Sequence, residues 1–289
     1  MFNYLWQRAN KATPAVTAAP AVKAPSAPSA PVWHYPTNVT YVKEFADMLK
    51  APHLLIGGTT GSGKSTVLNG IMVAAITTMS PSKASFILID PKCVELSQYE
   101  NLPHVWKYIE DAEDVPGVLD TVIAYMEAEY RRMKAAGIRQ SDAQHLYIVI
   151  DELADLMISA YRKPIQEKMQ KILAKGRAAN IHLFACTVAP SRKVIPAELV
   201  LNFTNRVALR CLTAIESRQI INVSGAEKIT GHGKAMYLSP QKGVETLTGI
   251  PYYTDEEIED RVAFWVCQKT GKARPKFDGS GIKVSVRIN

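Results

Sequence analysis

The chain has 289 residues, of which 47% are hydrophobic and 21% charged, and its formal net charge is +7. This length and composition suffice for one large α/β domain or two small ones and exclude global disorder. No apolar run approaches the roughly 18 residues of a membrane-spanning helix, and the N-terminus lacks the pattern of a secretory signal. The positive charge is compatible with a polyanionic partner but does not establish one.

The first 32 residues differ in composition from the rest of the chain. Residues 1–12 form a short apolar segment that includes Phe2 and Trp6, and residues 13–32 are rich in Ala and Pro, which predicts an extended, semi-rigid linker. The apolar segment is either a frayed terminus or a docking peptide for a protein or membrane-surface partner. We therefore expect the globular part of the chain to begin after residue 32.

A complete phosphate-binding pattern, G-x-x-x-x-G-K-[ST], follows the linker. A buried strand is expected before it, over His53–Gly57, and an apolar helix after it, over Thr66–Met79. In this setting backbone N–H groups and the helix N-terminus bind phosphate, Lys64 reaches the β- and γ-phosphates, and the Ser65 hydroxyl holds Mg²⁺. The expected nucleotide-binding residues of this loop are Gly58, Thr59, Thr60, Gly61, Ser62, Gly63, Lys64, Ser65 and Thr66.

Two acidic residues follow a later apolar run, Leu146–Ile150. A continuous apolar run that ends in Asp151-Glu152 is typical of a buried parallel strand that delivers acids to the C-terminal edge of a sheet. Downstream of a phosphate-binding loop, Asp151 is expected to hold Mg²⁺ through its water shell, and Glu152 to orient and polarise the attacking water. The pair therefore favours hydrolysis of the nucleotide over binding alone.

The other apolar runs alternate between strand and helix along the chain. This alternation predicts an α/β fold with a mainly parallel sheet and helices on both faces. The chain ends in a run that is either a short strand or a trailing tail, Gly279–Asn289. The remaining expected elements are helices within Trp33–Lys50 and over Ala112–Ala136 and Gln166–Ala179, and strands over Ala84–Asp90, Ile181–Thr187, Arg206–Leu212 and Ala235–Leu238.

Four cysteines are widely spaced and form no C-x-x-C pair: Cys93, Cys186, Cys211 and Cys267. We interpret them as buried free thiols of a reducing compartment. With neither a membrane span nor a secretory signal in the sequence, they predict a cytoplasmic protein.

Several sequence blocks beyond the phosphate loop point to one family. They are Pro52–Ile56, Asp90-Pro91-Lys92 followed by Glu95-Leu96-Ser97, Asp151–Met157, Lys175–Ala179, Glu216-Ser217-Arg218 and Gly225–Lys228. In unbroken order from about Pro52 to Val262, the chain resembles the motor domain of FtsK/SpoIIIE-type DNA translocases. The resemblance implies a RecA-like P-loop NTPase fold over residues 33–270, followed by a short tail, residues 271–289.

The resemblance also implies an activity and an assembly. Members of the family form homo-oligomeric rings of six subunits. These rings hydrolyse ATP, with Mg²⁺, to thread double-stranded DNA through a central pore. Carried over by motif, Lys64 and Glu152 are catalytic, and Arg177 matches the arginine that reaches into the neighbouring subunit's site, where a positive charge stabilises the transition state. Thr187 would lie where a hydroxyl senses the γ-phosphate, although it is equally compatible with a structural strand end.

Three departures from the family pattern stand out. Val188-Ala189 replace a usual Gln-Arg pair, which places part of the γ-phosphate sensing in question, and Val200 and Ala214 occupy positions that are often Lys. The family's membrane-spanning N-terminus and DNA-reading winged-helix domain find no counterpart in the sequence. As a hypothesis, the contacts to the DNA backbone fall to Arg192, Lys193 and Arg218.

Two functions therefore compete. The first is a ring-forming translocase that moves duplex DNA without reading its sequence and serves a mobile element such as a phage, a plasmid or an integrated element. The second is a nucleotide-gated assembly or adaptor ATPase that recruits a partner through the N-terminal segment. Stimulation of ATP hydrolysis by duplex DNA separates the two.

Overall fold

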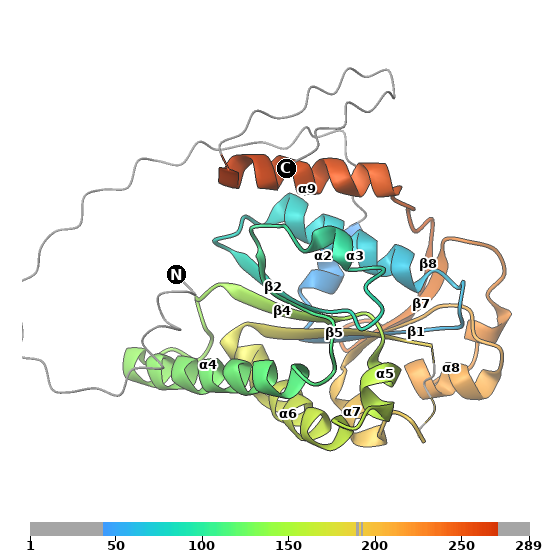
Figure 1. Cartoon of the computed structure of the whole chain (residues 1–289). Coiled ribbons are helices and arrows are strands. Elements are labelled where there is room, and N and C mark those ends of the chain that lie inside the picture. The colour runs from blue at the N-terminus through green and yellow to red at the C-terminus, as the bar shows by residue number, and fades with distance from the viewer. Residues whose placement is uncertain (1–42, 189–190, 192, 271–289) are drawn as a thin grey trace, which may run out of the picture. The chain divides into compact units, whose positions relative to one another are not determined.

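The computed structural model describes residues 43–188, 191 and 193–270 (Figure 1). The N-terminal segment, the linker, the C-terminal tail with its possible strand, and Arg192 lie outside the described residues, so the expectations for them stay predictions. The described elements are α2 (Lys43–Leu49), β1 (His53–Gly57), α3 (Lys64–Thr78), β2 (Ala84–Ile89), η1 (Ser97–Tyr99), β3 (Val105–Ile109), α4 (Val115–Ala136), β4 (His145–Ile150), α5 (Leu153–Ile158), α6 (Arg162–Lys175), η2 (Gly176–Ala179), β5 (Ile181–Thr187), α7 (Ala197–Asn202), β6 (Asn205–Ala208), α8 (Ala214–Ile221), η3 (Ala226–Lys228), β7 (Lys234–Ser239), β8 (Gly243–Thr248) and α9 (Asp255–Thr270).

Within the described part of the chain the strands form one eight-stranded sheet in the order β3-β2-β4-β5-β1-β6-β7-β8. The strands from β3 to β6 are parallel, and β7 and β8 extend the sheet antiparallel. We call the side where β1, β4 and β5 end the C-terminal edge, and the side where they begin the N-terminal edge. Ligands of open α/β sheets bind at the C-terminal edge, so this order places the phosphate loop and the two acids together.

Helices cover both faces of the sheet. In Figure 1, α2, α3 and α9 lie on one side of the strands, and α4, α6 and α7 lie on the other. The strands between them are buried on both faces: every residue of β1, β2 and β5 is buried, which explains their continuous apolar runs. The predicted α/β class with a mainly parallel sheet is confirmed. None of the helices in the described ranges has the length and apolarity that crossing a bilayer requires.

Several sequence-based expectations were wrong in detail. The helix expected over Gln166–Ala179 is two elements, α6 and the 3₁₀ turn η2, and the strand expected over Arg206–Leu212 stops at Ala208. The strands β3 and β8 and the helices α5, α7, α8 and α9 were not predicted at all. Of the four cysteines, Cys186 and Cys211 are buried as expected, Cys267 is half-buried, and Cys93, against expectation, is exposed.

Candidate active site

The phosphate-binding loop connects β1 to α3 at the C-terminal edge, as its sequence pattern demands. The helix begins at Lys64, and the residue before it, Gly63, has φ 100° and ψ 23°. This left-handed conformation is rarely open to residues with a Cβ, which explains the glycine of the motif. The loop is tied to its neighbours in the sheet: Gly58 N–H donates to the carbonyl of Thr187, the last residue of β5, and Thr59 N–H donates to that of Arg210, two residues after β6 ends.

The Lys64 ammonium lies over the loop. Its Nζ donates to the carbonyl oxygens of Gly58 and Thr59, each at 3.0 Å. Partial burial lowers the pKa of Lys64, and the nearby Asp151 and Glu152 oppose that shift. A lysine held at this point can reach the terminal phosphates of a nucleotide bound in the loop.

The acids at the end of β4 occupy different environments. Asp151 is half-buried, and its pKa rises to about 7, first because burial disfavours the charged carboxylate and then because Asp90, Glu95 and Glu152 repel it. The Glu152 carboxylate is only 2% exposed and accepts hydrogen bonds from the N–H groups of Ala154 and Val188, all at 3.2 Å. Asp151 would therefore be stabilised by a bound cation, and the Glu152 carboxylate is held in one orientation.

The contact with Val188 bears on one departure from the family pattern. Glu152 binds the backbone N–H of Val188, at the end of β5, and not its side chain. This link between β4 and β5 is therefore available whatever side chain residue 188 carries.

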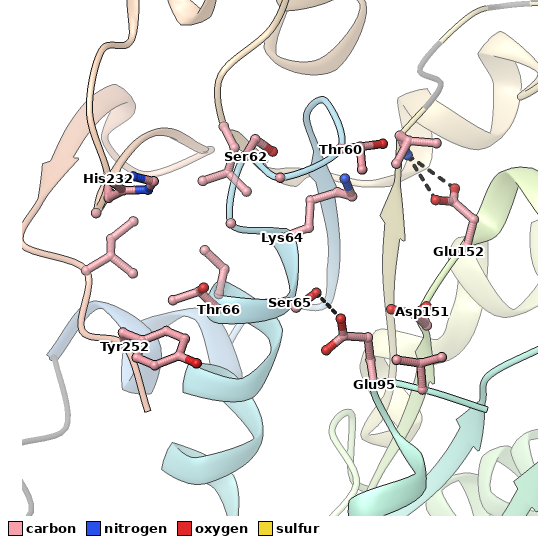
Figure 2. A pocket seen from close by; sticks show the side chains of 18 of the residues that line it. Thr60, Ser62, Lys64, Ser65, Thr66, Glu95, Asp151, Glu152, His232 and Tyr252 are labelled. Carbon is pink, nitrogen blue, oxygen red and sulfur yellow. Dashed lines mark hydrogen bonds between the residues drawn. The ribbon is translucent and has the colours of Figure 1, made fainter. Parts of the chain in front are cut away.

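Glu95 is a site residue that reasoning from the motifs missed. The Ser65 hydroxyl donates to Glu95 Oε1 at 2.6 Å (Figure 2). The loop that carries Glu95 is fixed by the buried Asp90, whose carboxylate accepts the N–H groups of Val94 and Leu96 at 3.0 and 2.9 Å. The sequence held a signal, since Glu95 follows the predicted strand Ala84–Asp90 closely enough to lie in the loop at the same edge of the sheet.

These groups surround one cavity of about 740 Å³, a size typical of small-molecule sites. Figure 2 shows the loop residues in its middle, the acids at one side, and His232 and Tyr252 at the other. The Ser62 hydroxyl is buried without a hydrogen-bond partner among the described residues, so the loop holds a polar group that a ligand can satisfy. The lining residues are Thr60–Val67, Lys92, Val94, Glu95, Asp151, Glu152, Val188, Leu209, His232, Gly233, Ile250 and Tyr252.

The donor set of this cavity suits Mg²⁺. Within the part of the chain that the structure describes, no group of three or more His, Cys, Asp or Glu side chains is arranged to hold a metal alone. Magnesium is usually bound by one or two protein oxygens together with substrate phosphates and waters. Ser65 and Asp151, with Glu95 beside them, provide such oxygens next to the phosphate loop.

Other residues expected from the sequence lie apart from the cavity. Thr187 is fully buried and does not line it. Lys193, in the turn before α7, and Arg218, on α8, are both exposed. Arg177 is exposed on η2, at the N-terminal edge. The roles expected for these four residues stay predictions.

Sequence comparisons find similar proteins in one family. Residues 26–148 match the sequence model of the FtsK/SpoIIIE family. The chain is 33% identical to the DNA translocase FtsK of Pseudomonas aeruginosa over 255 residues, and 38% identical to the DNA translocase SftA of Bacillus subtilis over 231 residues. These matches cover 76% and 75% of this chain, but only 31% and 24% of the relatives. The chain thus spans about a third or less of the length of the curated relatives it matches.

Solved structures share the fold. The conjugation coupling protein TcpA, in its monomer form with ATPγS, aligns with a TM-score of 0.63 and 20% identity over 73% of this chain and 65% of that chain. The cytoplasmic domain of the type VII secretion ATPase EccC of Thermomonospora curvata aligns with a TM-score of 0.62 and 23% identity over 76% of this chain and 28% of that chain. These likenesses support the RecA-like P-loop fold expected from the sequence.

Proposed function

From the match of residues 26–148 to the FtsK/SpoIIIE family, which confirms the resemblance seen in the sequence, we propose that the chain is an ATP-driven translocase that moves double-stranded DNA. The observation that carries the proposal is the meeting of Lys64, Ser65, Asp151 and Glu152 around one cavity at the C-terminal edge. Phosphate binding, a magnesium site and a water-orienting acid are what nucleotide hydrolysis requires. The proposed substrate is DNA because the similar proteins are named DNA translocases, and the family resemblance makes duplex DNA the expected form.

The proposed roles follow from the contacts at the site. Loop N–H groups and Lys64 bind the phosphates, and Ser65 and Asp151 hold Mg²⁺, which neutralises charge on the transferred phosphoryl group when bound. Glu152 is the group that polarises the attacking water. Hydrogen bonds from two backbone N–H groups fix its carboxylate, so it needs no reorganisation when the nucleotide arrives.

The position of Arg177 supports action on a neighbouring subunit. Arg177 lies just before β5 begins, whereas the cavity lies where that strand and its neighbours end. The seven residues of β5 span roughly 20 Å at about 3.3 Å per residue, far beyond the reach of an arginine side chain. An exposed arginine at this edge can serve a nucleotide only on another copy of the chain. We therefore propose a homo-oligomeric ring, with the hexamer of the family as its expected size.

The DNA contacts are proposed from charge and exposure. Lys193 and Arg218 are exposed cations on separate segments, and Arg192 lies outside the described residues. A motor that must grip every base step alike contacts phosphates rather than base edges, and this predicts steep weakening of DNA binding with salt. The mobile-element setting stays a prediction, tested by whether loss of the gene stops transfer or packaging of such an element.

The deciding experiment compares ATP turnover with and without duplex DNA at low salt. We expect strong stimulation by duplex DNA of any sequence and loss of the stimulation as salt rises from 50 to 300 mM. The Lys64→Ala protein is the control for contaminating ATPase. Nucleotide binding with no stimulated turnover would contradict the translocase and indicate the adaptor ATPase instead.

A further inference from the structure

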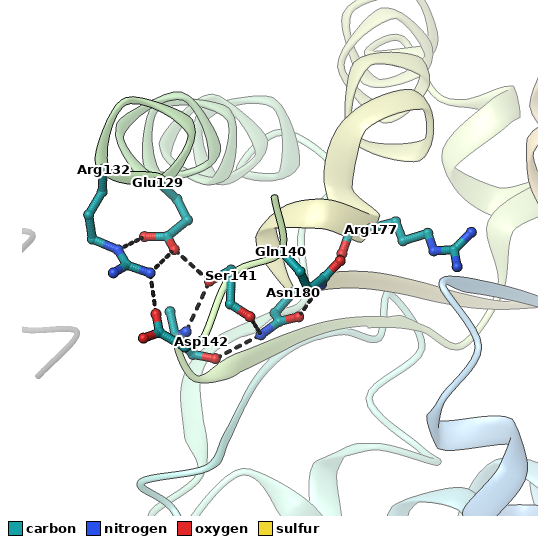
Figure 3. Close-up of polar contacts among 8 residues, drawn as sticks. Glu129, Arg132, Gln140, Ser141, Asp142, Arg177 and Asn180 are labelled. Atoms are coloured by element: carbon teal, nitrogen blue, oxygen red, sulfur yellow. Dashed lines mark hydrogen bonds and ion pairs between the residues drawn. The ribbon is translucent and has the colours of Figure 1, made fainter. Parts of the chain in front are cut away.

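The segment that carries Arg177 is held by a network of polar contacts that lies away from the cavity (Figure 3). Arg177 belongs to the 3₁₀ turn Gly176–Ala179, which we call the arginine turn. Beside it runs the connection between α4 and β4, residues 137–144, which we call the α4–β4 loop. In Figure 3 the Arg177 side chain points away from this network, while its backbone takes part in it.

The α4–β4 loop binds the backbone carbonyls of the arginine turn. Gln140 Nε2 donates to the carbonyl of Arg177 at 3.1 Å, and Ser141 N–H donates to that of Ala178 at 2.8 Å. Just before the turn, the Tyr130 hydroxyl of α4 donates to the carbonyl of Lys175 at 2.9 Å. Three carbonyls at the end of α6 and in the turn are thus bound by groups of α4 and its loop, although a helix end usually leaves such carbonyls to solvent.

Asn180 closes the turn and joins it to the same loop. Its backbone is left-handed, with φ 55°, and its N–H donates to the carbonyl of Arg177 at 3.2 Å. Its buried side-chain amide donates to the carbonyls of Ser141 and Ala143 at 3.1 and 2.9 Å and accepts from Gln140 Nε2 at 2.9 Å. Every hydrogen-bonding atom of this amide group therefore faces the α4–β4 loop.

The loop is in turn anchored on α4 by charge. Glu129 is 5% exposed, and its carboxylate accepts two hydrogen bonds from the Arg132 guanidinium, at 2.6 and 2.9 Å, and one from the Ser141 hydroxyl. Arg132 also pairs with Asp142 of the loop. The Arg132 guanidinium lowers the pKa of Glu129 despite its burial. A buried carboxylate that is paired in this way holds its partners in one geometry.

We propose that this cluster is a positioning device for Arg177, formed by Glu129, Arg132, Gln140, Ser141, Asp142 and Asn180. It fixes the backbone on both sides of Arg177 and leaves the side chain to project from the surface toward the nucleotide of an adjoining copy. The inference rests on the proposed trans role of Arg177 and adds the residues that direct it. A positioning role is physically sensible because displacing a transition-state charge by about 1 Å can cost about a hundredfold in rate.

Gln140 gives the cleanest test, because it is exposed and its removal spares the core. In the full chain with duplex DNA and ATP, Gln140→Ala is expected to lower kcat about threefold to tenfold, the worth of roughly one hydrogen bond, and to leave the Kd for ATP unchanged. In an Arg177→Ala background, single-turnover hydrolysis should no longer respond to Gln140→Ala, because the group it positions is gone.

Gln144→Ala is the matched control. Gln144 lies on the same loop but donates to the carbonyl of Pro81 and not to the arginine turn. The Gln144→Ala protein should therefore have the same kcat as the wild type. The positioning role is wrong if Arg177→Ala is slow while Gln140→Ala matches wild type, or if Gln140→Ala costs the same with and without Arg177. If Arg177→Ala itself leaves hydrolysis unchanged, the trans arginine is wrong and this inference falls with it.

Discussion

The two edges of the parallel sheet hold acidic residues in opposite electrostatic states. At the C-terminal edge, Asp151 lies among other carboxylates, and its pKa rises to about 7 because burial and like charges disfavour ionisation. Beside the N-terminal edge, the buried Glu129 is paired with Arg132, and its pKa falls below its usual range. The first arrangement gains stability from an added cation, whereas the second already contains its counter-charge.

Histidines sharpen the contrast. His53, His104, His145 and His182 all lie at or next to the start of parallel strands, so the N-terminal edge holds four of the six histidines in the chain. Two of them form hydrogen bonds inside the protein: His145 Nδ1 lies 2.9 Å from His182 Nε2, and His182 Nδ1 lies 2.8 Å from the carbonyl of Ala51. One edge thus holds a cavity lined by carboxylates that repel one another, as at Asp151, whereas buried polar side chains at or beside the other, such as Glu129 and His182, are paired within the protein.

The largest expected effect comes from substitutions at the C-terminal edge. Lys64→Ala and Glu152→Gln should each reduce ATP hydrolysis by on the order of a thousandfold or more. Only Glu152→Gln should still bind ATP well, because its amide oxygen can keep accepting backbone hydrogen bonds while Lys64 still meets the phosphates. Calorimetric titration with a slowly hydrolysed ATP analogue measures the difference. Equal loss of binding in both variants would contradict the assigned roles.

The next effect concerns the arginine on the opposite edge. Arg177→Ala should lower kcat by on the order of a thousandfold, while each subunit keeps an intact cavity and its affinity for ATP. Mixed with wild-type subunits, it should depress hydrolysis at the neighbouring wild-type cavities. Turnover measured against the wild-type fraction should therefore fall below the straight line between the pure proteins. A strictly proportional line would show that Arg177 does not act in trans.

Acid should destabilise the protein through the N-terminal edge. Burial lowers the pKa of His53 to about 3 and of His182 to about 4, so both are neutral when folded. The unfolded chain, with histidine pKa values near 6.5, binds more protons as the pH falls, so stability is full above about pH 6.5 and declines toward pH 4. Each such histidine should cost roughly 2 kcal/mol between pH 7 and pH 5.

Urea unfolding at pH 7 and pH 5 measures this loss, and His182→Gln should reduce it while lowering stability at pH 7. His104→Gln offers a second position, since burial also lowers the pKa of His104, to about 4. Asp151 opposes this loss, because a group whose pKa is raised to about 7 in the folded state adds stability as the pH falls from 7 to 5. The test is therefore the difference between proteins: a pH dependence of the free energy of unfolding that is the same in wild type and in His182→Gln would contradict the neutral, buried state of His182.

The smallest expected effect comes from replacing one glycine at each edge of the sheet by alanine. Gly63, before α3, and Gly137, after α4, both have positive φ, at 100° and 68°. An alanine at either position should cost about 1 kcal/mol of backbone strain. Only Gly63→Ala should also weaken ATP binding, because its strain falls on the phosphate loop. Thermal unfolding and ATP titration of the two variants separate the effects, and equal ATP affinities would show that the loop tolerates the strain.

The central strands and the phosphate loop could be predicted because their signals are local. Strands buried on both faces, such as β1 and β4, are continuous apolar runs, and the loop has fixed residue types at fixed spacing. The missed strands β3 and β8 form the two ends of the sheet and are partly exposed, so their sequences carry no apolar run. The missed helices α5, α7 and α8 have only six to eight residues, too few to show a helical period. The helix α9 packs against α3 through side chains such as Trp265, whose indole N–H donates to the carbonyl of Ile76.

The sequence by itself determined the phosphate loop, the acid pair and the family resemblance, because each depends on neighbours along the chain. Only the tertiary structure decided the rest. It brought Glu95 onto the Ser65 hydroxyl, and it placed Arg177 a full strand length from its own cavity, inside the network of Glu129 and Asn180. The physical reason is that these relations join separate strands and loops, so the order of strands in the sheet, which no local pattern encodes, sets which side chains meet.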